Sequence, residues 1–186
     1  MIRRALLSLL AAASIVACSP PAPPAPAAAS ASSTSATVGE ELDRIDERTP
    51  LPLSPMMANH QKQNMREHLV AVQEVVAGLS TGDFAAVEKA ASRIGYSEGM
   101  GQMCTHMGAA APGFTDQALS FHRAADRIAA AARDGDQARV LAELGETLRA
   151  CTGCHAAWKQ RIVDDETLAR LTAAAADGET NVSHSP

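Results

Sequence analysis

The sequence predicts an all-α protein whose folded part is an antiparallel four-helix bundle. Of its 186 residues, 46% are hydrophobic but only 3% are aromatic, and alanine is abundant. A β-sandwich or barrel is built from β-branched and aromatic side chains, so this composition favours helices instead. Four segments carry apolar residues at three- and four-residue spacing, which is the period of one helix face. The short connections between these segments favour an antiparallel bundle.

Each predicted helix has an apolar seam that is expected to face the core. The first helix begins after Pro55 and ends before residues 80–83, and the second ends at Gly95. The third begins after Gly113 and ends at residues 134–136. The four seams are Met65, Leu69, Val72, Val76 and Leu79; Phe84, Val87, Ala91 and Ile94; Ala118, Phe121, Ala125, Ile128 and Ala132; and Leu141, Leu144, Leu148, Cys151, His155, Trp158 and Ile162. These alanine-rich seams supply little apolar volume, so a further group is expected to fill the core.

The remaining folded segments are shorter. Residues 95–114 contain several glycines and Pro112, so they are predicted to form a connection with at most a short helical piece. The bundle is expected to occupy residues 51–163. A C-terminal extension and tail, residues 164–186, is helical from about 165 to 176 and frayed over its last ten residues.

The N-terminus reads as an export signal. Residues 1–17 contain Arg3 and Arg4, then an apolar run of about a dozen residues, which is shorter than the roughly 20 that a membrane-spanning helix needs. The run ends in Ile-Val-Ala-Cys, which resembles the lipobox of bacterial lipoproteins and implies cleavage before Cys18 and lipidation of its thiol. A soluble secreted protein cut at another site is the alternative.

A flexible linker follows, residues 18–50, whose part from 19 to 38 consists almost entirely of Pro, Ala, Ser and Thr. We therefore expect a domain tethered by lipid to the periplasmic face of a membrane. Ser19 after the cysteine favours the outer membrane by the usual sorting rule.

Charge excludes one class of partner. The formal net charge is −5, and no basic run extends beyond Arg3 and Arg4, so nucleic acid is not expected to bind. An acidic surface favours redox partner proteins with basic patches, through contacts that weaken with salt. Homodimer formation stays open.

The chemical signature is Cys151-Thr152-Gly153-Cys154-His155. C-x-x-C-H is the attachment motif of c-type haem, and on a helix its two thiols and its imidazole project from one side. Three other readings compete. A disulfide between the two cysteines is geometrically poor within a helix, a thioredoxin-like pair would need a βαβ unit, and a zinc site would need ligands such as Cys104 and His106.

The segment CTGCHAAWKQRI, near the end of the last helix of a four-helix bundle, resembles the class II c-type cytochromes, the cytochrome c-prime family. The resemblance covers about residues 55–163. It implies one covalent haem c packed inside the bundle, with His155 as an axial iron ligand. It also implies an aromatic residue and a basic residue, here Trp158 and Lys159, beside that ligand.

The sixth iron position decides the chemistry that the resemblance implies. In the low-spin branch of the family a Met of the first helix ligates the iron, and Met65 is the candidate here, although its spacing to the turn differs by about one residue. His68 is the alternative ligand, and a bis-imidazole haem would have a lower potential. If neither residue ligates, the iron is five-coordinate and open to NO or CO.

A cluster of soft donors lies between residues 100 and 107. It comprises Met100, Met103, Cys104, His106 and Met107. Such ligands suit copper, which makes a copper-binding lipoprotein the third functional reading. The alternative is a segment that covers a haem edge with flexible apolar side chains and one buried thiol.

The leading expectation is a mono-haem cytochrome that carries electrons on the periplasmic side of the membrane. No acid–base pair or nucleophile constellation stands out, so catalysis is not expected.

Overall fold

The computed structural model describes residues 39, 41 and 43–182, with side chains as far as residue 178. The expected signal peptide, Cys18 and the Pro/Ala/Ser tether lie outside these residues. The chain divides between Asp46 and Glu47 into two units, and the description below concerns the second.

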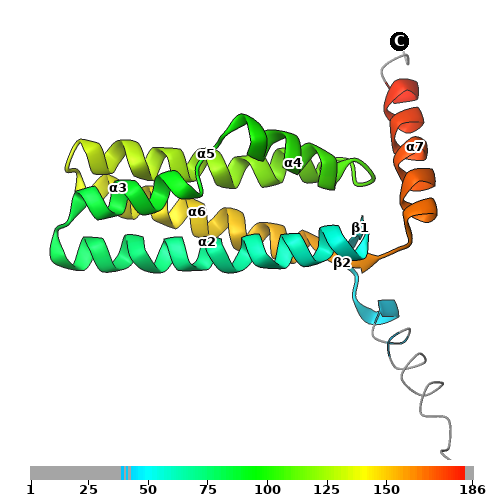
Figure 1. Cartoon of the computed structure of the whole chain (residues 1–186), viewed down its shortest axis with the longest axis horizontal. Helices are drawn as coiled ribbons and strands as arrows, with labels where there is room; N and C mark the ends of the chain where they lie inside the picture. The colour runs from blue at the N-terminus through cyan, green and yellow to red at the C-terminus, as the bar shows by residue number, and fades with distance from the viewer. Residues whose placement is uncertain (1–38, 40, 42, 183–186) are drawn as a thin grey trace, which may run out of the picture. The chain divides into compact units, whose positions relative to one another are not determined.

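The second unit is an all-α bundle to which two short strands are added (Figure 1). The bundle helices are α2, α3, α5 and α6, which run side by side. In chain order the elements are β1 (Thr49–Leu53), α2 (Pro55–Thr81), α3 (Phe84–Arg93), α4 (Glu98–Gly108), α5 (Phe114–Arg133), α6 (Gln137–Ala157), β2 (Trp158–Ile162) and α7 (Asp165–Val182). None of the described helices combines the length and the apolar character that crossing a membrane requires.

Short polar residues fix where the bundle helices begin. The side chains of Ser54, Asp83 and Asp136 accept hydrogen bonds from backbone N–H groups three residues later, at 3.3, 2.9 and 2.9 Å. These bonds satisfy N–H groups that have no partner within the first helical turn. Helix α2 ends at Gly82, whose φ of 69° is in the left-handed region that glycine adopts without strain. The helix limits expected from the sequence are therefore close to the observed ones for α2, α3 and α5.

Two segments differ from the expectation. Residues 98–108, expected to be mostly irregular, form the helix α4, whose N-terminus is capped by the Ser97 hydroxyl accepting from the Met100 N–H at 3.1 Å. The last bundle helix was expected to reach Ile162 but ends at Ala157, because residues 158–162 leave the helix to pair with β1.

The strands form a parallel pair at the end of the bundle where α2 begins and α6 ends. Thr49 is in register with Trp158, and Leu53 with Ile162. Leu51 and Leu53 are almost fully buried, and they pack in one apolar cluster with Met57, Phe114 and Trp158. Strand β1 therefore closes the core at this end, and it begins two residues before the expected start of the bundle.

The predicted seams of α3 and α5 face the core, and those of α2 and α6 do so in part, since Val72, Leu79 and Leu144 pack in it. Met65, Leu69 and Val76 of α2 are exposed, and so are Leu141 and Leu148 of α6. Helix α2 instead buries an adjacent face of small residues, which lets α3 approach closely: a Cβ on Gly78 would lie 2.8 Å from Val87 Cγ2. Periodicity finds an apolar face, but it does not reveal whether another helix covers it.

Candidate functional site

The C-x-x-C-H motif occupies the last two turns of α6. Cys151 and Cys154 are free thiols and half-buried, whereas the ring of His155 is exposed. Burial raises the pKa of both thiols, and for Cys154 the neighbouring Cys151 adds to the effect. The two thiols and the imidazole come from five consecutive residues near the end of α6.

The two thiols border different apolar clusters. Cys154 packs against the cluster that contains Leu51, Leu53 and Phe114. Cys151 packs against a second cluster formed by Ala71, Ile94, Phe121 and Ala125. Side chains of α2 and α5 contribute to both clusters, so the motif lies between these two helices in space.

Trp158 lies immediately beyond the motif, in β2 rather than in the helix. Its indole Nε1–H donates to Gln117 Oε1 of α5 at 2.6 Å. Its ring meets Phe114 edge to face, with centroids 5.6 Å apart. The hydrogen bond fixes the polar edge of the indole, and the contact with Phe114 fixes its apolar surface. The start of β2 is therefore tied to α5, four residues after Cys154.

Arg48 contacts the same segment from the other end of the chain. Its Nη1 donates to the carbonyl oxygens of His155 and Trp158, at 3.2 and 3.4 Å. Sequence reasoning missed this residue because it lies in the segment expected to be a flexible linker. No motif or spacing marks a contact between residues 107 positions apart.

The two candidates for the sixth iron position differ in their surroundings. Met65 is 40% exposed, on the uncovered face of α2. His68 is engaged in packing: its ring stacks on Phe121, with centroids 4.5 Å apart, and meets His122 edge to face at 5.4 Å. The side chain of Met65 is therefore accessible to a bound group, while the imidazole of His68 is already in contact with Phe121 and His122.

Both packed imidazoles are neutral at pH 7. Burial, and then the nearby His122, lower the pKa of His68 to about 4. Burial also lowers the pKa of His122, although a hydrogen bond with Ile94 and the charge of Asp126 oppose the shift. His122 Nδ1 lies 2.8 Å from the Ile94 carbonyl oxygen, so this nitrogen carries the proton and donates.

This burial predicts a pH-dependent stability. The pKa of His68 is about 4 in the folded protein against 6.5 without burial. The contribution of neutral His68 to the unfolding free energy is therefore fully present above pH 6.5. It is lost as the pH falls toward 4, because the imidazole takes up a proton in the unfolded chain at a higher pH than in the folded protein. We expect His68 to account for a loss of about 1–2 kcal/mol in unfolding free energy between pH 7 and pH 5. Urea titrations of the wild type and His68→Gln at both pH values measure it, and equal losses in the two proteins would contradict it.

The uncovered apolar residues lie on the two bundle helices that are not packed against each other. Helix α2 packs on α3, α3 on α5 and α5 on α6, but α2 and α6 do not pack along their lengths. The uncovered stripe is Met65, Leu69 and Val76 on α2 with Leu141 and Leu148 on α6. Apolar side chains that no other helix covers are available to contact a bound group. The motif follows Leu148 on the same helix and borders two apolar clusters, so its donor set and its surroundings fit a large flat group attached to α6.

The soft donors of α4 separate into two groups. Cys104 and Met107 are buried, and Met103 packs with Met107 in the cluster beside Cys154. His106 is exposed, on another side of the helix. Burial raises the pKa of the Cys104 thiol, which therefore stays protonated at pH 7. Within the described part of the chain, no group of three or more His, Cys, Asp and Glu side chains is arranged to hold a metal ion.

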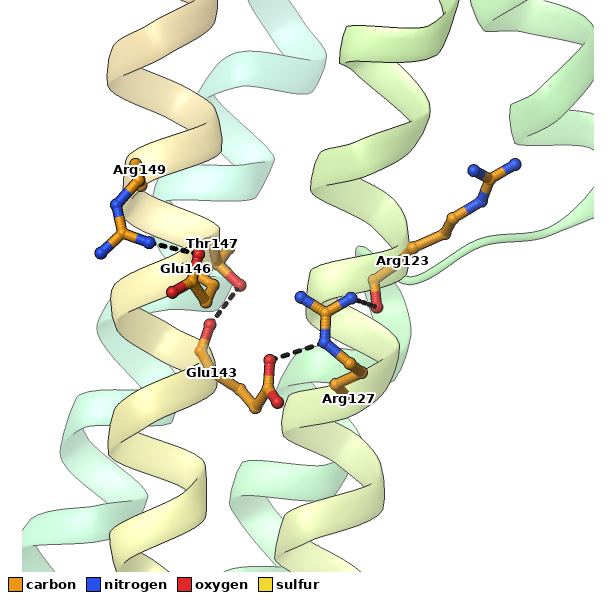
Figure 2. Close-up of polar contacts among 6 residues, drawn as sticks. All are labelled: Arg123, Arg127, Glu143, Glu146, Thr147 and Arg149. Carbon is orange, nitrogen blue, oxygen red and sulfur yellow. Dashed lines mark hydrogen bonds and ion pairs between the residues drawn. The ribbon is translucent and has the colours of Figure 1, made fainter.

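Polar contacts connect α5 with α6 and also form within each of these helices (Figure 2). Arg127 pairs with Glu143 at 2.6 Å and also donates to the Arg123 carbonyl oxygen at 3.2 Å. The Thr147 hydroxyl donates to the Glu143 carbonyl at 2.9 Å, and Arg149 pairs with Glu146 on the same helix. These arginines bind carboxylates of the bundle itself, whereas the guanidinium of Arg123 extends away from them.

Comparison with known proteins identifies a relationship over part of the chain. Residues 109–159 match the family described as Cytochrome C'. A curated cytochrome c' from Rubrivivax gelatinosus is 43% identical over 51 residues, which are 27% of this chain and 40% of that protein. The matched stretch begins after α4 and includes α5, α6 and the whole C-x-x-C-H motif. No solved structure matches the chain.

Proposed function

We propose that this chain, whose residues 109–159 match the cytochrome c′ family, carries single electrons through one haem c bound to the thiols of Cys151 and Cys154, with His155 as an axial iron ligand. Proteins of this family carry covalently attached haem c. When bound, the haem supplies one-electron chemistry at its iron, and the surrounding residues set its potential.

The observation that supports this proposal most is the uncovered apolar stripe of α2 and α6. Covering apolar area stabilises a protein by roughly 25 cal/mol per Å², and a porphyrin is large, flat and apolar over most of its surface. The stripe begins next to the motif, and the half-buried thiols lie on the inner side of α6. A group attached there shields these side chains and is itself shielded from water.

Met65 is proposed as the second axial ligand. Its thioether is accessible on the uncovered face of α2, whereas the ring of His68 is committed to Phe121 and His122. A thioether favours the reduced iron and raises the potential relative to a second imidazole. Trp158, fixed by Gln117 and Phe114, packs beside Cys154 and limits the access of water to this side.

The cellular setting is also part of the proposal. Members of this family are exported to the periplasm. We place this chain at the periplasmic face of a membrane, held through a lipid on Cys18, with the outer membrane as the favoured site. Its partners are redox proteins with basic patches, because the chain has a formal charge of −5. The protein acts as a carrier rather than as an enzyme.

Optical spectra of the haem-loaded protein test the proposal. We expect a low-spin spectrum, a weak red band from Met ligation in the oxidised form, and no change of the reduced form with CO. Met65→Ala should remove the red band and open the iron to CO, while His68→Gln should leave both properties as in the wild type.

Three other outcomes are informative. A high-spin wild type that binds CO would replace electron transfer by gas binding. Loss of low-spin character only in His68→Gln would move the ligand to His68. Absence of haem from the wild type would refute the proposal altogether.

A further inference from the structure

Arg48 contacts the backbone at the point where α6 ends. Trp158 N–H donates to the Cys154 carbonyl, and the chain then leaves the helix. The last carbonyl groups of a helix have no partner within it. The N–H that would reach the His155 carbonyl in a continued helix belongs to Lys159, which is part of β2. Arg48 Nη1 donates to this carbonyl instead, at 3.2 Å.

Strand β1 holds Arg48 in this place. Arg48 directly precedes Thr49, which is in register with Trp158, and the strand is anchored by the burial of Leu51 and Leu53. The same Nη1 reaches the Trp158 carbonyl at 3.4 Å, so one guanidinium spans the junction between α6 and β2. A cation at a helix C-terminus is stabilised by the helix dipole, which favours this placement.

The guanidinium is permanently charged and lies against the backbone of the residue that carries the imidazole. Reduction of an iron centre removes one positive charge from the site. A fixed cation nearby therefore favours the reduced state. The side chain of Arg48 is exposed, so dissolved salt weakens this effect.

We infer that Arg48 is a positioning residue of the haem site, which fixes the backbone of His155 and holds a positive charge beside the iron ligand. This inference rests on the proposed function. It makes the segment before the bundle part of the redox site rather than only a connection to it.

Midpoint potentials of haem-loaded variants test this role. Arg48→Gln should lower the potential at low ionic strength, and the difference from the wild type should shrink as salt is added. Arg48→Lys keeps the charge and should restore most of the potential. Arg139→Gln is the matched control: it removes the same charge from the first turn of α6, 16 residues or about 24 Å along the helix from His155, and should leave the potential unchanged.

A second readout reports the imidazole directly. The ring-proton NMR shifts of His155 in the reduced, diamagnetic protein should change in Arg48→Gln and stay in place in Arg139→Gln. If the midpoint potential of Arg48→Gln equals that of the wild type, even with a lower melting temperature, Arg48 only stabilises the fold and the inference is overturned. Equal losses in Arg48→Lys and Arg48→Gln would also overturn it. Failure of the proposed function is distinguishable, because the wild type would then contain no covalent haem, or would be high-spin and bind CO.

Discussion

The double variant Cys151→Ala/Cys154→Ala is expected to retain no haem after denaturation, whereas the wild type retains one. In the proposed function the two thiols supply both covalent bonds to the porphyrin, and Cys104, the other described cysteine, lies outside the motif. Mass spectrometry of the denatured protein, together with its absorbance, measures the attachment. Each single variant keeps one thiol and should show reduced attachment.

Cys104→Ala is the matched control for this experiment. Cys104 is a free buried thiol on α4, outside the motif, so its removal should leave haem attachment complete. Full attachment in the double variant would show that the motif is not the attachment site. Loss of attachment in Cys104→Ala would instead place a bond on α4.

Leu53→Ala is expected to lower the unfolding free energy by about 2–5 kcal/mol, because it leaves a cavity in the core. Leu53 is fully buried, at 0% exposure, in the cluster beside Cys154 and Trp158. Its register partner Ile162 is 51% exposed. Ile162→Ala removes a side chain of similar size from the same strand pair and should cost about 0.5 kcal/mol or less.

Chemical denaturation followed by circular dichroism measures both variants. Similar losses in the two would mean that the strand pair contributes through its backbone and not through burial of Leu53. A loss below about 1 kcal/mol in Leu53→Ala would mean that β1 does not close the core.

Local signals made most of the bundle predictable. Asp83 and Asp136 begin α3 and α6 as caps, and Gly82 ends α2, and each of these roles depends on only a few neighbouring residues. The motif is local as well, since Cys151 and His155 are one helical turn apart. The all-α class and the resemblance to the cytochrome c′ family were therefore accessible from the sequence alone.

The strand pair was not predictable by the same means. Pro50 and Pro52 argue against a strand because proline cannot donate a backbone hydrogen bond. In a parallel pair, alternate residues direct their N–H and C=O to the partner strand. The Leu53 carbonyl accepts from Val163 N–H at 3.0 Å, so Leu53 faces β2 and the two prolines face away. This alternation becomes visible only when the partner strand, more than a hundred residues later, is known.

The predicted faces of α2 and α6 were only partly right, for a different physical reason. A period of 3.6 residues identifies apolar positions such as Leu69 and Leu148, but a helix bundle and a bound group bury them equally well. Gly78 forms the close contact between α2 and α3 instead, and Ala71 is buried in the cluster with Phe121 and Ala125 of α5. In a protein that carries a large cofactor, the largest apolar side chains need not be those in helix–helix contacts.

The pairing of β1 with β2 also bears on the order in which the protein assembles. Arg48 and Trp158 are 110 positions apart, so their contact encloses the whole bundle within one loop. Contacts of such long range form slowly, because the intervening chain must first be ordered. We therefore expect β1 and β2 to pair only after the helices between them have formed. Until then the end of α6 is not covered by β1, and both motif thiols are accessible at that end.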